Sequence, residues 1–499
     1  MKVKALNISL AGALLLTIAA CGPKTDLEKT QTTVNQQTIK DHIYYLASDE
    51  LKGRNTGSEE IQIAADYLAD QLQKYGAKPA PGMSDYFQPV PLRIKTPATA
   101  AAFEYGGRNF GLNEDFLVVE GVSGSFEGEV VYLNYGLEAD YENAVVEGRM
   151  VFAKAGNGEV SDRRDILRLS REKYDLAKSK GAAGLVEFYS SPSTSWAQLG
   201  SSFNRVNISP ASAEESGEII PHLWLKDLDN ANQRFMMTRS IKRASISIEG
   251  MKNELTKDKN VVAVVEGTDP DLKGEYIMFS AHYDHVGIGA PNAEGDSIYN
   301  GTRDNAIGTV TVLSAAENIA KYPMKRSALF VLFTGEEKGL LGSRYLADHP
   351  IIPNNEIVFC WNSDNAGYND TTISTIIGLE RTTAAQYIKD ANQAFGLTAI
   401  DDPAGEQGLF DRSDNVSFAR KGIPAPTYSL GFTSFSGDVT KYYHQAGDNP
   451  NTVDYDYLEK FFKSYVYASR MIGNAEETPF WLPGDKYYET GMELYGKEK

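Results

Sequence analysis

The chain has 499 residues, and roughly two or three domains are expected from length alone. Its formal net charge of −18 disfavours a nucleic-acid-binding protein, because phosphate neutralisation needs a basic stripe that the sequence does not contain. Only two cysteines occur, Cys21 and Cys360, which excludes a disulfide framework and a thiolate zinc site.

The first 20 residues have the pattern of an export signal. Lys2 and Lys4 precede an apolar stretch that is too short and too interrupted to span a membrane comfortably. The following Ile-Ala-Ala-Cys21 resembles the lipobox of bacterial lipoproteins, in which the signal is cut before a cysteine that receives a diacylglycerol. We therefore expect a signal peptide over 1–20, lipid on Cys21 and a polar, flexible tether over 21–38. Ordinary secretion with a chance cysteine is the alternative.

A folded region is expected from Ile39 onwards. Ser58 can cap a helix with one apolar face, and Gly76 is placed to end it. Residues 96–250 differ in texture: short β-type runs alternate with Gly-rich turns, with one helical segment near 168–180. This pattern predicts a separate, β-rich unit inserted into the chain.

From Asn260 the chain alternates strand-type and helix-type segments. Because this alternation requires crossover connections, we expect an α/β domain with a mostly parallel central sheet and helices on both faces. The domain would be discontinuous, formed by residues 39–95 and 255–475, and followed by an irregular tail over 476–499. The strand-type runs are 260–268, 275–282, 327–335, 356–364 and 425–431.

The most informative stretch is 327–346. An apolar run from Ala328 to Phe333 stops abruptly at Thr-Gly-Glu336-Glu337. A run of this length fits a strand buried on both faces, and open α/β sheets bind ligands at the carboxyl ends of such strands. Neighbouring side chains there point in different directions, so one carboxylate can bind a metal while the other faces substrate. The alternative is that the pair forms the acidic first turn of the next helix, which the helix dipole favours.

Other predicted strands and loops also end in side chains that can bind metals. They are His282, Asp284, His285, Asp304, Asp364 and His444. Nitrogen and oxygen ligands without cysteine suit zinc, with manganese or cobalt as weaker candidates. Two ions commonly share one carboxylate, and a carboxylate that is not a ligand is then needed to take a proton from metal-bound water. The adjacent Glu336 and Glu337 provide one ligand and one base.

These motifs resemble those of the co-catalytic zinc exopeptidases, the family that includes bacterial leucyl aminopeptidases, glutamate carboxypeptidase and the transferrin receptor ectodomain. The resemblance rests on HYDHVG, the Asp304-Asn305 pair, TGEEKGLLGS, NSD and YH, and covers residues 39–90 and 260–473. It implies two zinc ions. One would be held by His282, Asp304 and Asp364, and the other by Asp304, Glu337 and His444.

The resemblance also implies roles for residues that are not ligands. Glu336 would be the general base that activates a zinc-bridging water, Asp284 would hydrogen-bond the ligating histidine, and Tyr443 would donate to the developing oxyanion. Asn415 stands where the family often has a histidine, which puts inferences about the substrate pocket in question. The inserted unit resembles a protease-associated domain through VVYLNYG, VEGRMVFAKAG and KSKGAAGLVEFY.

The expected function is that of a di-zinc exopeptidase acting on peptides, lipid-anchored in a bacterial cell envelope on the periplasmic or outer-surface side. Acidic residues near the motifs outnumber the basic Arg303, Arg412 and Lys441, which favours binding of an amino terminus and hence an aminopeptidase. The alternatives are a carboxypeptidase or dipeptidase, a glutaminyl cyclase-like acyltransferase with a single zinc, and a non-catalytic receptor-like protein. No nucleic-acid partner is expected, and the oligomeric state stays open.

Overall fold

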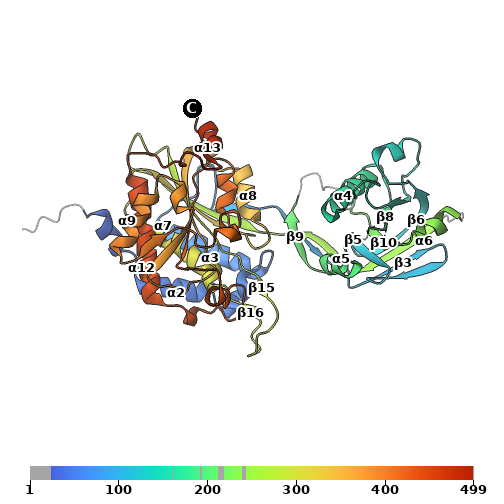
Figure 1. Cartoon of the computed structure of the whole chain (residues 1–499), viewed down its shortest axis with the longest axis horizontal. Coiled ribbons are helices and arrows are strands. Elements are labelled where there is room, and N and C mark those ends of the chain that lie inside the picture. Colours follow the sequence, from blue (N-terminus) through green and yellow to red (C-terminus); the bar gives the residue numbers. More distant parts are fainter. Residues whose placement is uncertain (1–23, 161, 192–193, 212–217, 239–242, 498–499) are drawn as a thin grey trace, which may run out of the picture.

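The computed structural model describes residues 24–160, 162–191, 194–211, 218–238 and 243–497. Two lobes lie side by side along its longest axis and meet at a narrow waist near β9 (Asn207–Pro210) (Figure 1). The predicted signal peptide and the lipidated Cys21 lie outside the described residues. Within them, no helix is both long and apolar enough to cross a bilayer.

The larger lobe is organised around an eight-stranded sheet. Its four central strands, β17, β14, β18 and β21, are parallel, while the pairs β13–β17 and β21–β19 are antiparallel. The predicted α/β sheet is therefore confirmed, parallel at its centre and mixed towards both edges. In sheet order the strands are β1 (Phe87–Pro89), β13 (Lys259–Val265), β17 (Ser327–Phe333), β14 (Tyr276–His282), β18 (Ile357–Ser363), β21 (Thr427–Leu430), β19 (Ile373–Ile377) and β20 (Thr398–Ile400).

Helices cover both faces of this sheet because side chains along each buried strand point alternately to either side. In β14, Ile277 and Phe279 belong to one apolar core and Met278 to the other. The first core is closed by α2 (Gln36–Leu46), α3 (Glu59–Tyr75), α7 (Gly308–Lys321), α9 (Ala385–Ala394) and α12 (Tyr455–Asn474). The second core is closed by α8 (Leu341–Asp348), α10 (Asn415–Ala419) and α13 (Tyr488–Leu494).

The smaller lobe contains a second eight-stranded sheet. Its middle strands β6, β7, β8 and β10 are parallel, which requires crossovers that include α4. This lobe is therefore mixed α/β rather than simply β-rich, and its identification as a protease-associated domain stays a prediction. Its elements are β3 (Ala100–Tyr105), β4 (Arg108–Gly111), β5 (Phe116–Glu120), β6 (Gly124–Tyr132), β7 (Met150–Lys154), α4 (Arg163–Ser179), β8 (Gly184–Tyr189), α5 (Trp196–Phe203), β10 (His222–Lys226), α6 (Ala231–Thr238) and β11 (Arg243–Glu249).

A three-stranded sheet, here called the joint sheet, connects the lobes. It consists of β2 (Leu92–Thr96), β9 (Asn207–Pro210) and β12 (Lys252–Leu255), with β2 in the middle and antiparallel to both neighbours. Leu92 packs with Val90 against Leu341 at the start of α8. The strands that lead to the smaller lobe therefore touch the larger lobe close to the Glu336–Glu337 turn.

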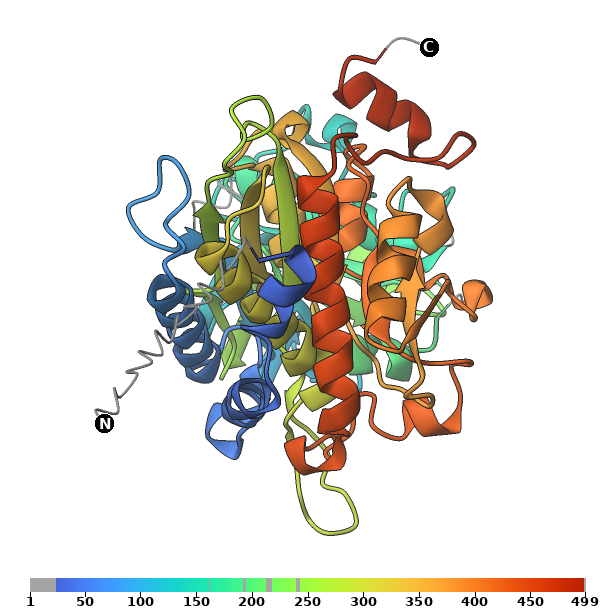
Figure 2. The same ribbon diagram turned by 90° about the vertical axis from the view of Figure 1, so that its left-hand side faces the viewer.

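The expectation of a flexible tether is wrong for the described residues before Ile39. This segment contains α1 (Asp26–Gln31), which lies beside α12 (Figure 2), and the start of α2. Arg470 of α12, whose side chain is fully buried, pairs with Asp26 at 2.8 Å, and Asn318 of α7 donates to Thr33 Oγ1 at 2.8 Å. The contacts that hold this segment are polar, and their partners come from distant parts of the chain. Composition alone therefore predicted a tether where the segment is folded.

The carboxyl-terminal tail, expected to be irregular, is packed onto the second core. Trp481 is 1% exposed, and its Nε1 donates to the backbone oxygen of Gly422 at 2.8 Å. The Arg381 guanidinium lies 3.8 Å from the centre of the Phe410 ring and pairs with Asp485 of the tail at 2.6 Å. The tail ends in α13, whose Met492 is buried in the same core.

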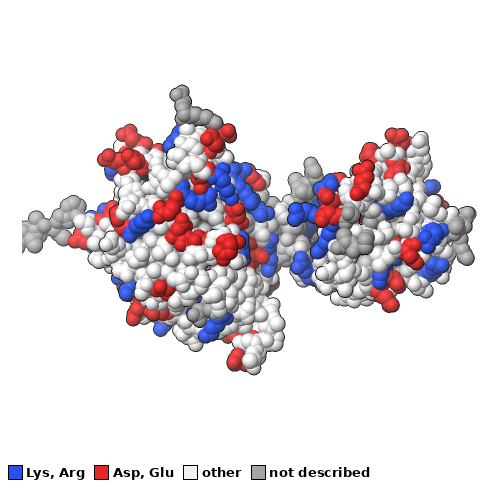
Figure 3. Space-filling view, viewed as in Figure 1, with Lys and Arg blue, Asp and Glu red and all other residues white. Residues whose placement is uncertain are grey.

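Charged side chains are intermixed over the face of the molecule seen in Figure 3. Acidic and basic groups are interspersed on both lobes, and several basic side chains gather on the part of the larger lobe that lies nearest the smaller lobe.

Candidate metal centre

Three neighbouring strands of the central sheet end at the candidate site. β14 ends at His282, β17 is followed by the Glu336–Glu337 turn, and β18 is followed by Asp364. Because β14 lies between the other two and is parallel to both, their carboxyl ends meet at one edge of the sheet. α8 begins only at Leu341, so the two glutamates lie in a turn rather than in the first turn of a helix.

Asp304 connects two groups of possible metal ligands. His282 Nε2 lies 3.3 Å from Asp304 Oδ1 and 3.2 Å from Asp364 Oδ1. His444 Nε2 lies 3.1 Å from Asp304 Oδ2 and 3.1 Å from Glu337 Oε2. The structure thus brings together all five side chains that the resemblance implies as ligands, with Asp304 in both groups.

His285 joins the second group, although the resemblance gave it no role. Its Nδ1 lies 2.8 Å from Glu337 Oε1 and 4.0 Å from Asp304 Oδ2, and the side chain is fully buried. The signal available in the sequence was its position in HYDH, directly after the end of the strand.

Asp284 holds the turn that carries the two glutamates. Its Oδ1 accepts from the backbone N–H of Glu336 at 3.1 Å, and its Oδ2 accepts from that of Glu337 at 3.3 Å. Thr56 donates its hydroxyl to Oδ2 at 2.9 Å. The carboxylate contact implied with His282 is longer, 3.6 Å from Nδ1 to Oδ1. The backbone oxygen of Asp284 lies 3.1 Å from the same Nδ1, so Asp284 orients His282 through its main chain and positions the two glutamates through its carboxylate.

Arg54 is a buried cation behind the site that sequence analysis did not single out. Its guanidinium donates to the backbone oxygens of Leu46, Tyr283, Asn300 and Gly301. Burial lowers the pKa of Arg54 to about 10, while the carboxylates of Asp284 and Asp304 oppose that shift. The group stays charged at neutral pH and offsets part of the negative charge of the site.

A pocket of about 90 Å³ opens beside the ligand groups. Tyr443 lines it and stacks on His444 with ring centres 4.1 Å apart. Tyr442 points elsewhere, with the Arg303 guanidinium 3.8 Å from the centre of its ring, so Tyr443 is the member of the pair that faces the pocket. The polar wall includes Glu336, Asp304 and Asp364, and the apolar wall includes Ile377, Leu409, Phe432 and Phe435.

The candidate ligands Asp304, Glu337 and Asp364 fall inside residues 260–468, which match the model of peptidase family M28. This segment belongs to peptidase family M28. His282 and His444 fall inside it as well. The match confirms the family resemblance read from the motifs.

Relatives of the M28 segment include named aminopeptidases. Probable leucine aminopeptidase 2 of Aspergillus oryzae is 24% identical over 370 residues, covering 68% of this chain and 65% of the relative, just under two thirds of its length. Aminopeptidase YwaD of Bacillus subtilis is 23% identical over 387 residues, covering 72% of this chain and 75% of the relative. A solved aminopeptidase from Aneurinibacillus sp. strain AM-1 shares the fold, with a TM-score of 0.50 at 17% identity over 92% of this chain and 99% of that one.

The M28 segment presents a set of donor atoms that fits zinc. His285 Nδ1, His444 Nε2 and Glu337 Oε1 are buried and make no hydrogen bond, although their neighbours are close. Buried polar atoms are rarely left without partners, so atoms that converge in this way indicate a place for a cation. Imidazole nitrogens and carboxylate oxygens without thiolate are ligands that zinc accepts in catalytic sites.

Negative charge dominates the electrostatics of the M28 site. Burial raises the pKa of Glu336 well above its ordinary value; His282 opposes this, and the carboxylates of Asp364 and Asp414 add to it. Burial would lower the pKa of His282, but Asp364 and Glu336 raise it well above its ordinary value. The pKa of Glu336 is raised chiefly by burial and that of His282 by the neighbouring carboxylates, and the carboxylates gathered around His282 favour binding of a cation.

Asp414 and Asn415 lie next to the pocket of the M28 segment. Asp414 is 1% exposed, and burial raises its pKa to about 7. Asn415, which stands where the family often has a histidine, donates its Nδ2 to the backbone oxygen of Ala425 at 3.0 Å. Asn415 does not line the pocket. Its hydrogen bond instead holds the backbone that leads into β21.

Proposed function

We propose that this chain is a zinc-dependent exopeptidase that binds two zinc ions and removes amino-terminal residues from peptides. The observation that carries the proposal is Glu336, a carboxyl group that lines the pocket beside both ligand groups and belongs to neither. The M28 match and the aminopeptidase names of the relatives support the same reaction class.

Bound zinc would supply Lewis acidity, which polarises a scissile carbonyl and lowers the pKa of an attacking water. The side chains of the protein move the protons. Glu336 accepts the proton of the attacking water and returns it to the leaving amine. Burial and the carboxylates of Asp304 and Glu337 raise the pKa of Tyr443, so its hydroxyl stays protonated and can donate to the developing oxyanion.

The charges around the pocket favour the amino terminus of a substrate. Arg303 is buried and pairs with Asp448 at 2.6 Å, which removes it as a partner for a substrate carboxylate. The Lys441 ammonium lies 4.9 Å from the centre of the Tyr442 ring. Among the described residues, Arg412 is the one cation of the pocket lining other than histidine. Because Arg412 could bind a substrate carboxylate, a carboxypeptidase is the second candidate.

One peptide offered in three forms separates these functions. The free, N-acetylated and C-amidated forms are incubated with zinc-loaded protein, and the products are identified by mass. We expect N-terminal trimming of the free and amidated forms and suppression by acetylation. Equal cleavage of the acetylated form, or trimming from the carboxyl end, would replace the aminopeptidase with the carboxypeptidase. A pyroglutamyl product from an N-terminal glutamine would indicate the cyclase.

The proposal includes export and anchoring of the protein to a bacterial membrane by lipid on Cys21, with the enzyme facing the periplasm or the cell exterior. The support is the lipobox-like sequence that ends at Cys21. Mass spectrometry of the mature amino terminus is the test. A diacylated start at Cys21 is expected, with release of the Cys21→Ser variant from membranes; an unmodified start downstream of residue 21 would contradict it.

A further inference from the structure

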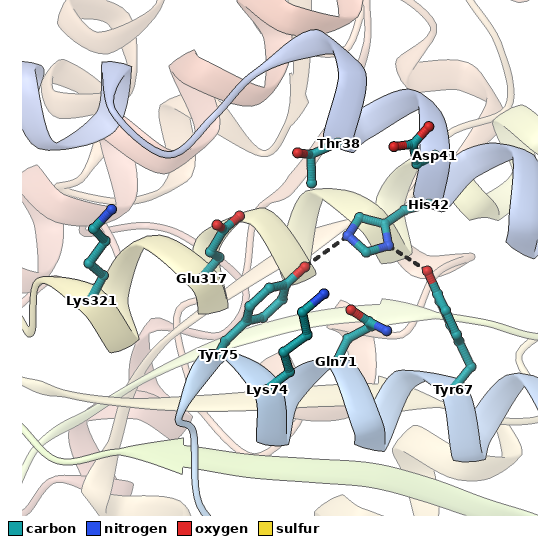
Figure 4. Close-up of a pocket in the computed structure, with 9 residues that line it drawn as sticks. All are labelled: Thr38, Asp41, His42, Tyr67, Gln71, Lys74, Tyr75, Glu317 and Lys321. Carbon is teal, nitrogen blue, oxygen red and sulfur yellow. Dashed lines mark hydrogen bonds between the residues drawn. The ribbon is translucent and has the colours of Figure 1, made fainter.

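A second pocket lies on the larger lobe, between α2, α3 and α7 (Figure 4). Its volume is about 680 Å³, within the range of about 300 to 1,000 Å³ typical of small-molecule sites. None of its lining residues lines the pocket beside the metal centre, so the two sites are distinct.

The floor of this pocket is formed by His42, which is hydrogen-bonded to the hydroxyls of two tyrosines. His42 Nδ1 lies 2.6 Å from the Tyr67 hydroxyl, and His42 Nε2 lies 2.8 Å from the Tyr75 hydroxyl (Figure 4). Burial lowers the pKa of His42 to about 4, so the imidazole is neutral at neutral pH. A neutral imidazole donates from one nitrogen and accepts at the other. One tyrosine therefore accepts from the ring and keeps its own O–H free for a ligand.

The walls of this pocket carry acidic and basic side chains that, in the part of the chain that the structure describes, form no direct ion pair with each other. Glu317 of α7 is half-buried, and Lys74 of α3 points towards the pocket (Figure 4). Among the described residues neither side chain forms a hydrogen bond or a close ion pair, although the charges of Lys321 and Lys74 both act on Glu317. Asp41 and Lys321 add a second acid and a second base to the lining.

We infer that this pocket binds a small zwitterion, whose ammonium group meets Glu317 and whose anionic group meets Lys74 and the free tyrosine O–H. A ligand with one charge would leave the opposite wall unpaired, whereas a zwitterion bridges both. Charge-assisted hydrogen bonds of this kind are roughly twice as strong as neutral ones.

Two sources have this chemistry. One is a free α-amino acid, the product of the proposed peptidase reaction; this source rests on the proposed reaction, and the second source rests on the proposed lipid anchor. The other is a phosphoethanolamine lipid headgroup. The Lys24 ammonium lies 3.4 Å from the Tyr322 hydroxyl, and Tyr322 follows the pocket residue Lys321, so the chain enters the fold beside the pocket. Cys21 is three residues before Lys24, a distance of at most about 10 Å along the chain. A lipid on Cys21 would therefore bring the pocket close to the headgroups of a membrane.

Calorimetric titration of the zinc-loaded mature protein tests the inference without requiring turnover. The zwitterionic probes are leucine and O-phosphoethanolamine. Ethylammonium and inorganic phosphate are the probes that carry charge of one sign, here called the single charges. At least one zwitterion should bind, and Glu317→Gln and Lys74→Met should each weaken it about tenfold, which corresponds to about 1.4 kcal/mol. Asp70→Asn on α3 and Lys78→Met just after it are matched controls outside the pocket and should bind as wild type does.

The titration also identifies the source of the ligand. Tighter binding of leucine indicates an amino acid site, and tighter binding of O-phosphoethanolamine indicates a headgroup site. The inference is overturned if neither zwitterion binds, if the single charges bind equally well, or if binding survives both pocket substitutions. In that last case the same titration on zinc-free protein shows whether the metal centre holds the probe. A failed peptide assay would leave this result unchanged, so the two proposals fail separately.

Discussion

Glu336 and Glu337 are neighbours in the chain, yet their replacement should have different effects. Glu336→Gln removes the proposed base and not a ligand, so kcat should fall by about 10²- to 10⁴-fold or more with zinc content near wild type. Glu337→Gln removes a ligand candidate that lies 3.1 Å from His444, so zinc content should fall. Metal analysis beside steady-state kinetics measures both. Wild-type turnover by Glu336→Gln would reject the assignment of the base.

His42 should make stability depend on pH. Its pKa is lowered to about 4 by burial, with Lys74 contributing and Asp41 opposing, whereas the unfolded chain titrates near 6.5. As the pH falls, the unfolded state binds the proton first. This contribution to stability is therefore intact above about pH 6.5 and is lost between about pH 6.5 and 4, by about 2 kcal/mol at pH 5.

His42→Gln provides the comparison, because glutamine can bond the two tyrosines without titrating. Urea unfolding at pH 7 and pH 5 gives the free energy of unfolding of both proteins. The wild type should lose more stability than the variant over this interval. Equal losses would show that His42 is not buried as described.

Sequence reasoning located the site residues by a simple geometric rule. Side chains at the carboxyl ends of neighbouring parallel strands must converge, and His282, Glu337 and Asp364 do so. The same reasoning could not assign Asp284 its contact with the backbone of Glu336, because a bond between two loops depends on their exact course. Arg54 was missed for a related reason: its partners are backbone carbonyls, which have no sequence signature.

Among the elements, the tail that ends in α13 should be essential for stability. Trp481 is 1% exposed and packs near Phe410, whose neighbour Leu409 lines the pocket beside the metal centre. Trp481→Ala should cost about 3 to 5 kcal/mol through the cavity it leaves. Chemical denaturation measures the loss.

A second residue of the tail supplies the control for Trp481. Lys486 pairs with Asp411 at 2.7 Å, but both side chains are about half exposed. Lys486→Met should therefore change stability by about 0 to 1 kcal/mol. If the two substitutions cost the same, the tail is not an integral part of the second core.

Periodicity predicted the main elements well and the chain ends badly. α3 begins after Ser58, whose hydroxyl accepts from the N–H of Ile61, and ends at Gly76 with a φ of 97°, as its sequence predicts. α1 also begins with a local signal, since Thr25 and Glu28 form a capping box, but its place in the fold is fixed by Asp26 and Arg470, which are 444 residues apart in sequence. Contacts of that range are set by the assembled core and cannot be read from local spacing.

For the whole molecule, the smaller lobe should be dispensable for metal binding. Thr96 of β2 and Lys252 of β12 are directly paired, so an Asn-Gly turn replacing residues 97–251 would close a regular two-residue hairpin and remove β9 together with the smaller lobe. Zinc content should stay near wild type, because the metal-binding groups found among the described residues all lie after Asn260. Metal analysis checks this. Loss of zinc with an intact circular dichroism spectrum would contradict the separation of roles.

The joint sheet also provides a packing contact between the larger lobe and the strands that lead to the smaller lobe. Leu341 packs against Val90 and Leu92 and directly follows the turn that carries Glu336 and Glu337. If a molecule binds the smaller lobe and shifts the joint sheet, it displaces Leu341 and the Glu336–Glu337 turn. The affinity of the metal centre for zinc then changes. Linkage is reciprocal, so zinc would change the affinity for that molecule by the same factor. The metal content of the protein at equilibrium would then depend on whether that molecule is bound to the smaller lobe.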